Sequence, residues 1–408
     1  MVCVGLRENI YYNKNVSVFI NLIWGVIMEK EIYLDNSATT QLFVQASEKT
    51  GKALLACYGN PSSLHKKGFE AEKEVKKARK IIADALNVDT SEIYFCSGGT
   101  EANNWAIEGV ARKYAKKGRH LITSVIEHPS VLHAFKRLSE TGFEVTYLPV
   151  NSRGELNIDD LREALREDTI LVSIMYVNNE IGVVYPIKEI ADVVKAKSAA
   201  FLHVDAVQGF GKMDIYPKQW KIDLLSITAH KLHGPKGVGV LYFQKKMDIP
   251  SLLVGGSQEG EKRAGTENVP GIIGFGEAVR ILEQSKGERA RINSFKNILL
   301  KGIDTIPGAN FNGNPHTNIS PIINVWFKGI DRAEVLMHML EAKGLYVSTG
   351  SACHSRKKEP SHVLVAIGAK NEALFGSIRL SFGFLNTEVE AISAITILSE
   401  TVQELRHI

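Results

Sequence analysis

The fold class is most apparent in FLHVDAVQGFGKMDIYPKQWKIDLLSITAH, residues 201–230. It opens with the largely apolar run FLHVDAV (201–207) and closes with a second such run, LLSITAH (224–230). Short runs of this kind are typical of strands that are buried on both faces of a sheet. The sequence therefore predicts two buried strands here, and polar residues stand where each of them ends.

Similar runs occur on both sides of this stretch and are separated, in the earlier part, by helical segments. They are EIYFCS (92–97), HLITSV (120–125), FEVTYLPV (143–150), TILVSIMYV (169–177) and GVGVLYF (237–243). The amphipathic segments between them include FEAEKEVKKARKIIADAL (69–86) and IDDLREALRE (158–167). This alternation predicts an α/β fold with a mostly parallel, seven-stranded sheet. In such sheets ligands bind beyond the carboxyl ends of the strands.

The character of the chain changes after residue 255, where GGSQEGEKRAGTEN is polar and rich in glycine. Strand-like and helical segments then follow in NISPIINVWF, DRAEVLMHMLEAKG and SIRLSFGFL, and a last helix is expected over 387–407. This mixture predicts a smaller α+β domain. We divide the chain into an appendage of unknown role (1–27), a segment joining the small domain (28–40), a large domain (41–260) and a small domain (261–408).

Composition favours a folded protein that acts on small molecules. Of 408 residues, 44% are hydrophobic and 23% are charged, which are ordinary values for a globular chain. The net charge of +4 comes from 49 basic and 45 acidic residues, a balance that argues against direct nucleic-acid binding.

The N-terminal apolar run VSVFINLIWGVIM (16–28) is too short for the ~20 residues of a membrane-spanning helix. No small-residue cleavage site follows it to support a signal peptide. Because the strand-like EIYLDNSATT comes shortly after Met28, residues 1–27 are interpreted as an appendage or an upstream start. A short helix on a membrane surface is the less favoured alternative, and no membrane association is expected.

Cysteine usage points to a reducing compartment. The cysteines at positions 3, 57, 96 and 353 form no CxxC pair and have no metal-ligand spacing. Neither a metal site nor a disulfide framework is predicted, and the cytoplasm is the expected location.

A lysine follows the second strand of the opening stretch, in LLSITAHKLHGPKG (224–237). At the end of a buried strand, desolvation can lower the pKa of Lys231, which suits Schiff-base chemistry. The alternative is an ordinary surface lysine.

Two further strand ends carry complementary groups. Asp205 follows the strand before Lys231, where a carboxylate can pair with a pyridine nitrogen; a helix N-cap is the alternative. The loop CSGGTEANN (96–104) opens a helix, so the N–H groups near Gly99 and Thr100 suit a phosphate. A lysine, an acid and a phosphate cradle together predict one pyridoxal 5'-phosphate site.

The chain resembles the cysteine desulfurases of the class-V aminotransferase group, which have the fold type I architecture of pyridoxal-phosphate enzymes. The resemblance covers residues 30–407. Its motifs, in chain order, are LDNSATT (34–40), GNPSSLHKKG (59–68), SGGTEANN (97–104), IEHPSV (126–131), VNNEIG (177–182), HVDAVQ (203–208), AHKLHGPKG (229–237), RAGTENVPG (263–271) and GSACHSRKKEPSHVL (350–364).

The resemblance implies a role for each matching residue. Lys231 would bind the cofactor covalently and shuttle protons, and His128 would stack on the ring; a buried structural histidine is the alternative. The remaining cofactor ligands would be Gly99, Thr100, Asn179, Asp205, Gln208, Thr228, His230 and, from the other subunit of a homodimer, Thr266. L-Cysteine would be bound by Asn36, Asn179 and Arg379, with Arg379 receiving its carboxylate.

Cys353 differs from the two cysteines that we interpret as small buried hydrophobes, Cys57 and Cys96. It follows Gly350-Ser351-Ala352 and precedes the basic stretch HSRKK, which favours a thiolate. The resemblance implies that this thiolate attacks the sulfur of L-cysteine, forms a persulfide and leaves L-alanine. A regulatory thiol, or one merely tolerated on the surface, is the alternative. No resident metal is expected, although Cys353 could hold an iron-sulfur cluster transiently.

The sulfur acceptor stays open at this point. An iron-sulfur scaffold protein and a tRNA or cofactor thiolation enzyme are equally compatible with the sequence, and a purely degradative role is a third possibility. Two rival functions are another class-V enzyme, such as an aminotransferase or selenocysteine lyase, and a non-catalytic adaptor with the same fold.

Overall fold

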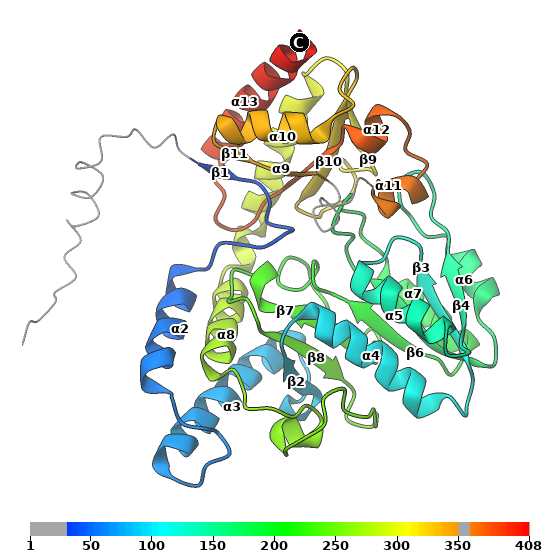
Figure 1. The fold of residues 1–408 in the computed structure, drawn as a ribbon, viewed down its shortest axis with the longest axis vertical. Coiled ribbons are helices and arrows are strands. Elements are labelled where there is room, and N and C mark those ends of the chain that lie inside the picture. Colours follow the sequence, from blue (N-terminus) through cyan, green and yellow to red (C-terminus); the bar gives the residue numbers. More distant parts are fainter. Residues whose placement is uncertain (1–30, 350–359, 408) are drawn as a thin grey trace, which may run out of the picture.

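The computed structural model describes residues 31–349 and 360–407. These residues form three sheets: a large one of seven strands in the lower part of Figure 1, a small one of four strands in the upper part, and one of two strands beside the small one. The appendage expected over residues 1–27 and the cysteine at position 353 both lie outside the described residues.

The large sheet has seven strands in the order β2-β8-β7-β6-β5-β3-β4. All neighbouring pairs are parallel except those that β8 makes with β2 and β7. The predicted α/β class and mostly parallel sheet are confirmed, and each predicted run contains its strand. The strands are β2 (Ile93–Cys96), β3 (His120–Ser124), β4 (Glu144–Leu148), β5 (Thr169–Met175), β6 (Phe201–Asp205), β7 (Leu224–Thr228) and β8 (Gly239–Phe243).

Helices cover both faces of this sheet. Successive strand residues point to opposite faces, so each face packs against its own set of helices. Leu121 packs in a cluster with Trp105 of α4 (Gly99–Tyr114) and with α5 (Pro129–Ser139). The next residue, Ile122, belongs to the larger core that contains residues of α3 (Lys66–Leu86), α7 (Ile187–Lys197) and α8 (Val269–Gln284). Burial on both faces explains why the strands read as apolar runs.

Two further helices and the short 3₁₀ turns complete the large part of the molecule. α2 (Val44–Ala56) packs against α8, and α6 (Ile158–Ala164) packs against α7 and β4. The 3₁₀ turns are η1 (Thr90–Glu92), η2 (Ala229–Lys231), η3 (Gln258–Glu261) and η4 (Lys286–Glu288).

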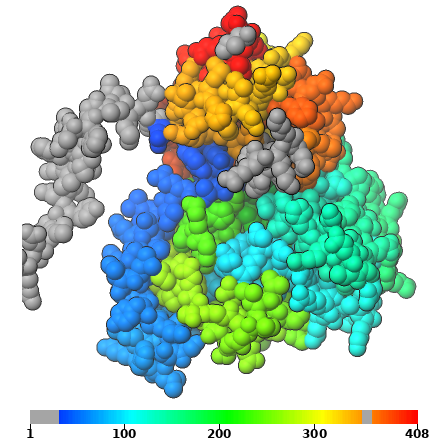
Figure 2. Space-filling model, in the orientation of Figure 1, coloured from blue at the N-terminus to red at the C-terminus, as the bar shows by residue number. Residues whose placement is uncertain are grey.

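The small sheet is antiparallel and has the order β12-β13-β10-β9. Its strands are β9 (Ala309–Asn312), β10 (Ile322–Phe327), β12 (Ser348–Thr349) and β13 (Ile378–Ser381). The accompanying helices are α9 (Arg289–Asp304), α10 (Ala333–Ala342), α11 (His362–Ala366), α12 (Glu372–Phe375) and α13 (Glu388–Arg406). In Figure 2 this yellow-to-red part lies directly on the green and cyan large part.

The N-terminal described residues connect the two parts. β1 (Ile32–Tyr33) pairs in parallel with β11 (Leu345–Tyr346) beside the small sheet, and the chain then crosses to α2. The boundary expected at residue 260 stays a prediction, because α8, which follows it, packs against α2 and α3 of the large part.

Candidate active site

A cavity of about 470 Å³ lies where the predicted ligand site was expected, beyond the carboxyl ends of the large-sheet strands. Asp205 is the last residue of β6 and Thr228 the last residue of β7. Strand order brings these ends together, although the sequence separates them. Ten of the predicted site residues line the cavity, namely Gly99, Thr100, His128, Asn179, Asp205, Gln208, Thr228, His230, Lys231 and Arg379.

Three of the predicted residues are not among those that line the cavity. The Asn36 amide instead donates to the carbonyls of Tyr33 and Ser381, so it braces the chain after β1. Thr266 is exposed on the loop before α8. Cys353 lies outside the described residues.

Lys231 enters the cavity from η2, the turn that follows β7. Its ammonium donates to the Ala38 carbonyl at 2.7 Å and also to the Ser37 carbonyl. Both carbonyls belong to the LDNSATT segment, which is about 190 residues away in sequence. The tertiary fold thus places the reactive amine beside these two carbonyls. This contact could not be predicted from the sequence.

The Asp205 side chain accepts hydrogen bonds from two donors. Asn103 Nδ2 donates to one oxygen at 2.7 Å, and the Val207 N–H donates to the other at 3.0 Å. A carboxylate held in this way on the cavity wall can pair with a cationic ring nitrogen.

A chain of hydrogen bonds links Asp205 to the predicted stacking histidine. The Asn103 amide also donates to Ser130 Oγ at 2.9 Å, and Ser130 Oγ lies 2.8 Å from His128 Nδ1. The Ser130 N–H points at the same Nδ1, so this nitrogen is an acceptor and the ring proton is on Nε2. Burial lowers the pKa of His128, which keeps the ring neutral near pH 7.

Asn103 lines the cavity, although no role was assigned to it from the sequence. It lies four residues after Gly99 on α4, so helical spacing places it on the same face as the phosphate loop. That spacing, inside the quoted motif SGGTEANN, is the signal that could have found it.

The phosphate cradle is built around the start of α4. A Cβ on Gly99 would lie 2.7 Å from Val207 Cγ2, so only glycine permits this close approach. Free N–H groups at a helix start attract anions. Thr228 is buried beside them, and burial together with the Lys231 charge lowers the pKa of His230 to about 4. Neutral His230 therefore still has a ring N–H to donate to an anion.

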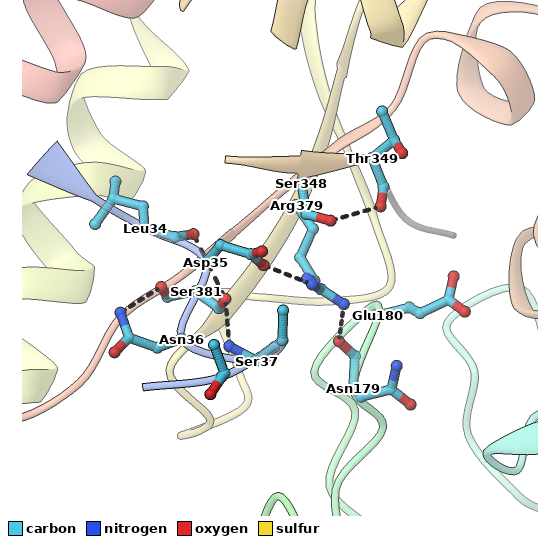
Figure 3. A network of polar contacts seen from close by, with 12 residues as sticks. Leu34, Asp35, Asn36, Ser37, Asn179, Glu180, Ser348, Thr349, Arg379 and Ser381 are labelled. Carbon is cyan, nitrogen blue, oxygen red and sulfur yellow. Dashed lines mark hydrogen bonds and ion pairs between the residues drawn. The ribbon is translucent and has the colours of Figure 1, made fainter. Parts of the chain in front are cut away.

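Arg379 reaches the cavity from β13 of the small sheet (Figure 3). Its guanidinium donates to Asp35 Oδ1 at 2.7 Å and to the Asn179 carbonyl at 3.0 Å. Among the described residues, its buried Nε has no hydrogen-bond partner. A buried donor without a partner marks a place where an anion can bind.

Two buried carboxyls next to the cavity were not predicted. Glu127 precedes His128, and burial raises its pKa to about 8. Glu180 follows Asn179 and accepts a hydrogen bond from Ser361 Oγ; burial raises its pKa to about 7. His362, which also lines the cavity, bonds through Nε2 to the Glu127 carbonyl at 2.9 Å. Nothing in the sequence distinguishes these two buried glutamates from glutamates on the surface.

Residues 32–393 match the class-V aminotransferase family. "Cysteine desulfurase IscS" of Methanosarcina thermophila is 46% identical over 379 residues, covering 93% of each chain. The chain belongs to the cysteine desulfurase family. The solved structure "NIFS-LIKE PROTEIN" is 38% identical, with a TM-score of 0.86, over 92% of this chain and 100% of that one. "SspA in complex with cysteine" is 34% identical, with a TM-score of 0.75, over 86% and 98%.

The other expectations concern metals, membranes and thiols. Among residues 31–349 and 360–407, no three His, Cys, Asp or Glu side chains gather where they could hold a metal ion. No helix within the same ranges is long and apolar enough to span a bilayer. Cys96 is buried as predicted, whereas Cys57 is only partly buried, because it borders a surface hollow beside α2 and α3.

Proposed function

We propose that this protein is a pyridoxal-phosphate-dependent cysteine desulfurase that converts L-cysteine to L-alanine and holds the sulfur as a persulfide on Cys353. The observation that carries the proposal is the cavity in which Lys231, Asp205 and Arg379 meet. Family membership supports both the cofactor and the reaction, because the relatives at this identity are cysteine desulfurases.

The cavity residues suit the cofactor in charge and shape. Asp205 would pair with the ring nitrogen, Gln208 would donate to the ring hydroxyl and Lys231 would bind the aldehyde carbon. Gly99, Thr100, Thr228 and His230 would hold the phosphate. When bound, pyridoxal phosphate supplies an electron-accepting ring that allows the α-proton of the substrate to leave.

The protein's own residues bind the substrate and move its protons. Arg379 has a buried Nε–H without a partner, and Asn179 lies beside it, so together they can receive the carboxylate of L-cysteine. The Lys231 amine accepts and returns the α-proton. The His128 Nε2 proton lies on the side of the ring opposite its bond to Ser130 and can hold or deliver a proton at the cavity wall.

The sulfur step balances without an external oxidant. The Cys353 thiolate attacks the sulfur of L-cysteine, an S–S bond forms and the C–S bond breaks. The electron pair of the broken bond stays with the substrate carbon, which takes a proton and becomes the methyl group of alanine. Cys353–SH and L-cysteine thus become Cys353–S–SH and L-alanine.

The Cys353→Ser variant tests this assignment. We expect the variant to keep the visible absorption of the bound cofactor and to lose alanine release by roughly 10³-fold or more, since hydroxyl is a poor nucleophile toward sulfur. Alanine and sulfide are measured with L-cysteine and a reductant. Undiminished desulfuration by this variant would contradict the role of Cys353 and favour the rival reading as another class-V enzyme.

We further propose a homodimer that buries the exposed apolar residues near the turn between α2 and α3. Leu55, Tyr58 and Leu64 are 84%, 71% and 105% exposed. The loop that carries Thr266 is tied to this side of the molecule by the ion pair of Arg79 with Glu259. A dimer through this face would therefore bring Thr266 near the partner's cavity, where it could reach the phosphate.

The acceptor of the sulfur is proposed to be a protein, either an iron-sulfur scaffold or a tRNA or cofactor thiolation enzyme. A cytoplasmic location is proposed with it, since a thiolate nucleophile needs a reducing compartment. Sulfur-labelled cysteine, followed by capture of the labelled acceptor, distinguishes the two classes. Label that leaves only as sulfide would favour a degradative role instead.

A further inference from the structure

A second lysine approaches the reactive one from the turn after β6. Lys212 lies four residues after Gln208, and its Nζ donates to Gln208 Oε1 at 3.0 Å. The proposed reaction gives Lys212 no task. A lysine with its amine among buried polar groups loses hydration, so its hydrogen bonds must compensate for that loss.

The bond from Lys212 decides which way the Gln208 amide points. Because Oε1 accepts from Lys212, Nε2 faces the opposite direction and donates to the Ser37 carbonyl at 2.9 Å. The same Ser37 carbonyl accepts from Lys231. The Ser37 carbonyl therefore connects the Lys212–Gln208 pair to Lys231.

The packing around Lys212 indicates a supporting role, not a second ligand site. Lys212 and Lys231 both line a separate hollow of about 10 Å³, with Asn36, Thr40 and His233. A space of this size is at the lower limit for a single water molecule. The side chain is therefore packed as part of the wall behind the reactive lysine.

Two cationic side chains and two histidines interact electrostatically with the Lys212 amine. Burial, with the charges of Lys231 and Arg379, lowers the pKa of Lys212 to about 7. His230 and His233 also face it, and its charge contributes to the low pKa of each ring. Charged or neutral, the amine retains N–H groups, so the bond to Gln208 persists on both sides of neutral pH.

We infer that Lys212 is a positioning residue, which fixes the Gln208 amide so that it holds the Ser37 carbonyl and presents its second N–H to the ring hydroxyl of the cofactor. The inference rests on the proposed function. Without Lys212 the amide can rotate, and the hydroxyl oxygen then loses a donor that favours its anionic form.

The test compares Lys212→Met and Lys212→Arg with the wild-type protein, each loaded with pyridoxal phosphate. The visible absorption of the bound cofactor is titrated with pH. We expect the midpoint of Lys212→Met to move upward by on the order of one pH unit, because its anionic form loses a hydrogen bond. Lys212→Arg keeps a donor and should stay close to wild type. In Lys212→Met, kcat should fall while KM for L-cysteine changes little, since Arg379 is untouched.

Lys296→Met is the matched control, because Lys296 is also a buried lysine bonded to neutral oxygens, those of Asn318 and Ser320. Its midpoint should equal that of wild type. A shift in Lys296→Met as large as that in Lys212→Met would overturn the inference. Where Lys212→Met does not fold, Lys212→Leu decides, with a shift of the same sign expected, because leucine also lacks a donor for Gln208 Oε1. Superimposable titrations of the folded variants and wild type would also overturn it. If wild type itself develops no visible absorption with the cofactor, the proposed function fails instead.

Discussion

At the scale of single residues, contacts with the protein itself hold the charged side chains of the site. Arg379 has Asp35 at one end and the Asn179 carbonyl at the other, which leaves its Nε for a ligand (Figure 3). Asp205 is likewise held by Asn103 and Val207, which line the same cavity. Each charged group is fixed by protein contacts before a ligand arrives, which reduces the ordering cost of binding.

Substitution of Asp35 tests the support of Arg379. In Asp35→Asn the guanidinium loses its ionic partner and can turn away, so KM for L-cysteine should rise about tenfold with a smaller change in kcat. Steady-state kinetics of alanine release measure both values. Asp248→Asn is the control, because Asp248 forms exposed ion pairs with Lys113 and Lys262 outside the cavity. An unchanged KM in Asp35→Asn would contradict the role of this pair.

Substitution of Lys231 tests the covalent attachment. Lys231→Ala should still bind pyridoxal phosphate through the phosphate cradle and Asp205, and should release alanine roughly 10³-fold more slowly or not at all. Borohydride reduction followed by mass spectrometry detects a cofactor fixed to lysine. A covalent adduct in Lys231→Ala would place the attachment on another residue.

At the scale of elements, helix ends and helix pairs hold the site in place. Ser361 caps α11, accepting from the N–H groups of Val363 and Leu364, and donates to buried Glu180. The cap connects α11 to the segment that carries Asn179. In the large part of the molecule, α2 and α8 are joined by Glu277, whose carboxylate is bound by Lys49 of α2 and by Arg280.

Glu277 makes the stability of this helix pair depend on pH. Its hydrogen bond with Arg280 and its pairing with Lys49 lower the pKa of Glu277 to about 2. The unfolded value is higher, about 4.3, so the stabilisation is fully present above that pH and is lost as pH falls toward 2.

We expect Glu277→Gln to lower the free energy of unfolding by about 1 to 2 kcal/mol at pH 7, a value reduced because both cations are partly exposed. The deficit should shrink as pH falls from 4.5 to 2. Urea unfolding at several pH values measures it. Glu283→Gln, on the same helix but paired only with Lys286, is the control and should cost less than about 0.5 kcal/mol. A deficit independent of pH would show that the effect is not ionic.

At the scale of the whole molecule, the site depends on contact between the two parts of the chain. Asp205 and Lys231 belong to the large sheet, whereas Arg379 belongs to the small one. The segment from β1 to α2 brings Asp35, Ser37 and Ala38 between them. The cavity therefore exists only when both parts are folded and packed together.

The proposed dimer is tested at this scale. Leu55→Glu places a charge among the exposed apolar residues near the turn between α2 and α3, so the dimer should weaken at least about tenfold. Light scattering across protein concentration measures the association, and cofactor affinity should fall with it because Thr266 no longer reaches the partner's cavity. Ile392→Glu, an equally polar change at an exposed site on α13, should leave the dimer intact. A monomeric wild-type protein would overturn the proposal.

The sequence alone determined the strands, their mostly parallel arrangement and the residues at their ends, because burial on both faces leaves apolar runs that any reader of the chain can find. The phosphate loop, Asp205 and Lys231 were therefore predictable. The contacts of Asn103 with Asp205 and of Asp35 with Arg379 emerge only in the folded chain. These contacts join residues up to about 340 positions apart, and a polar side chain gives no sign in the sequence of which distant partner will balance it.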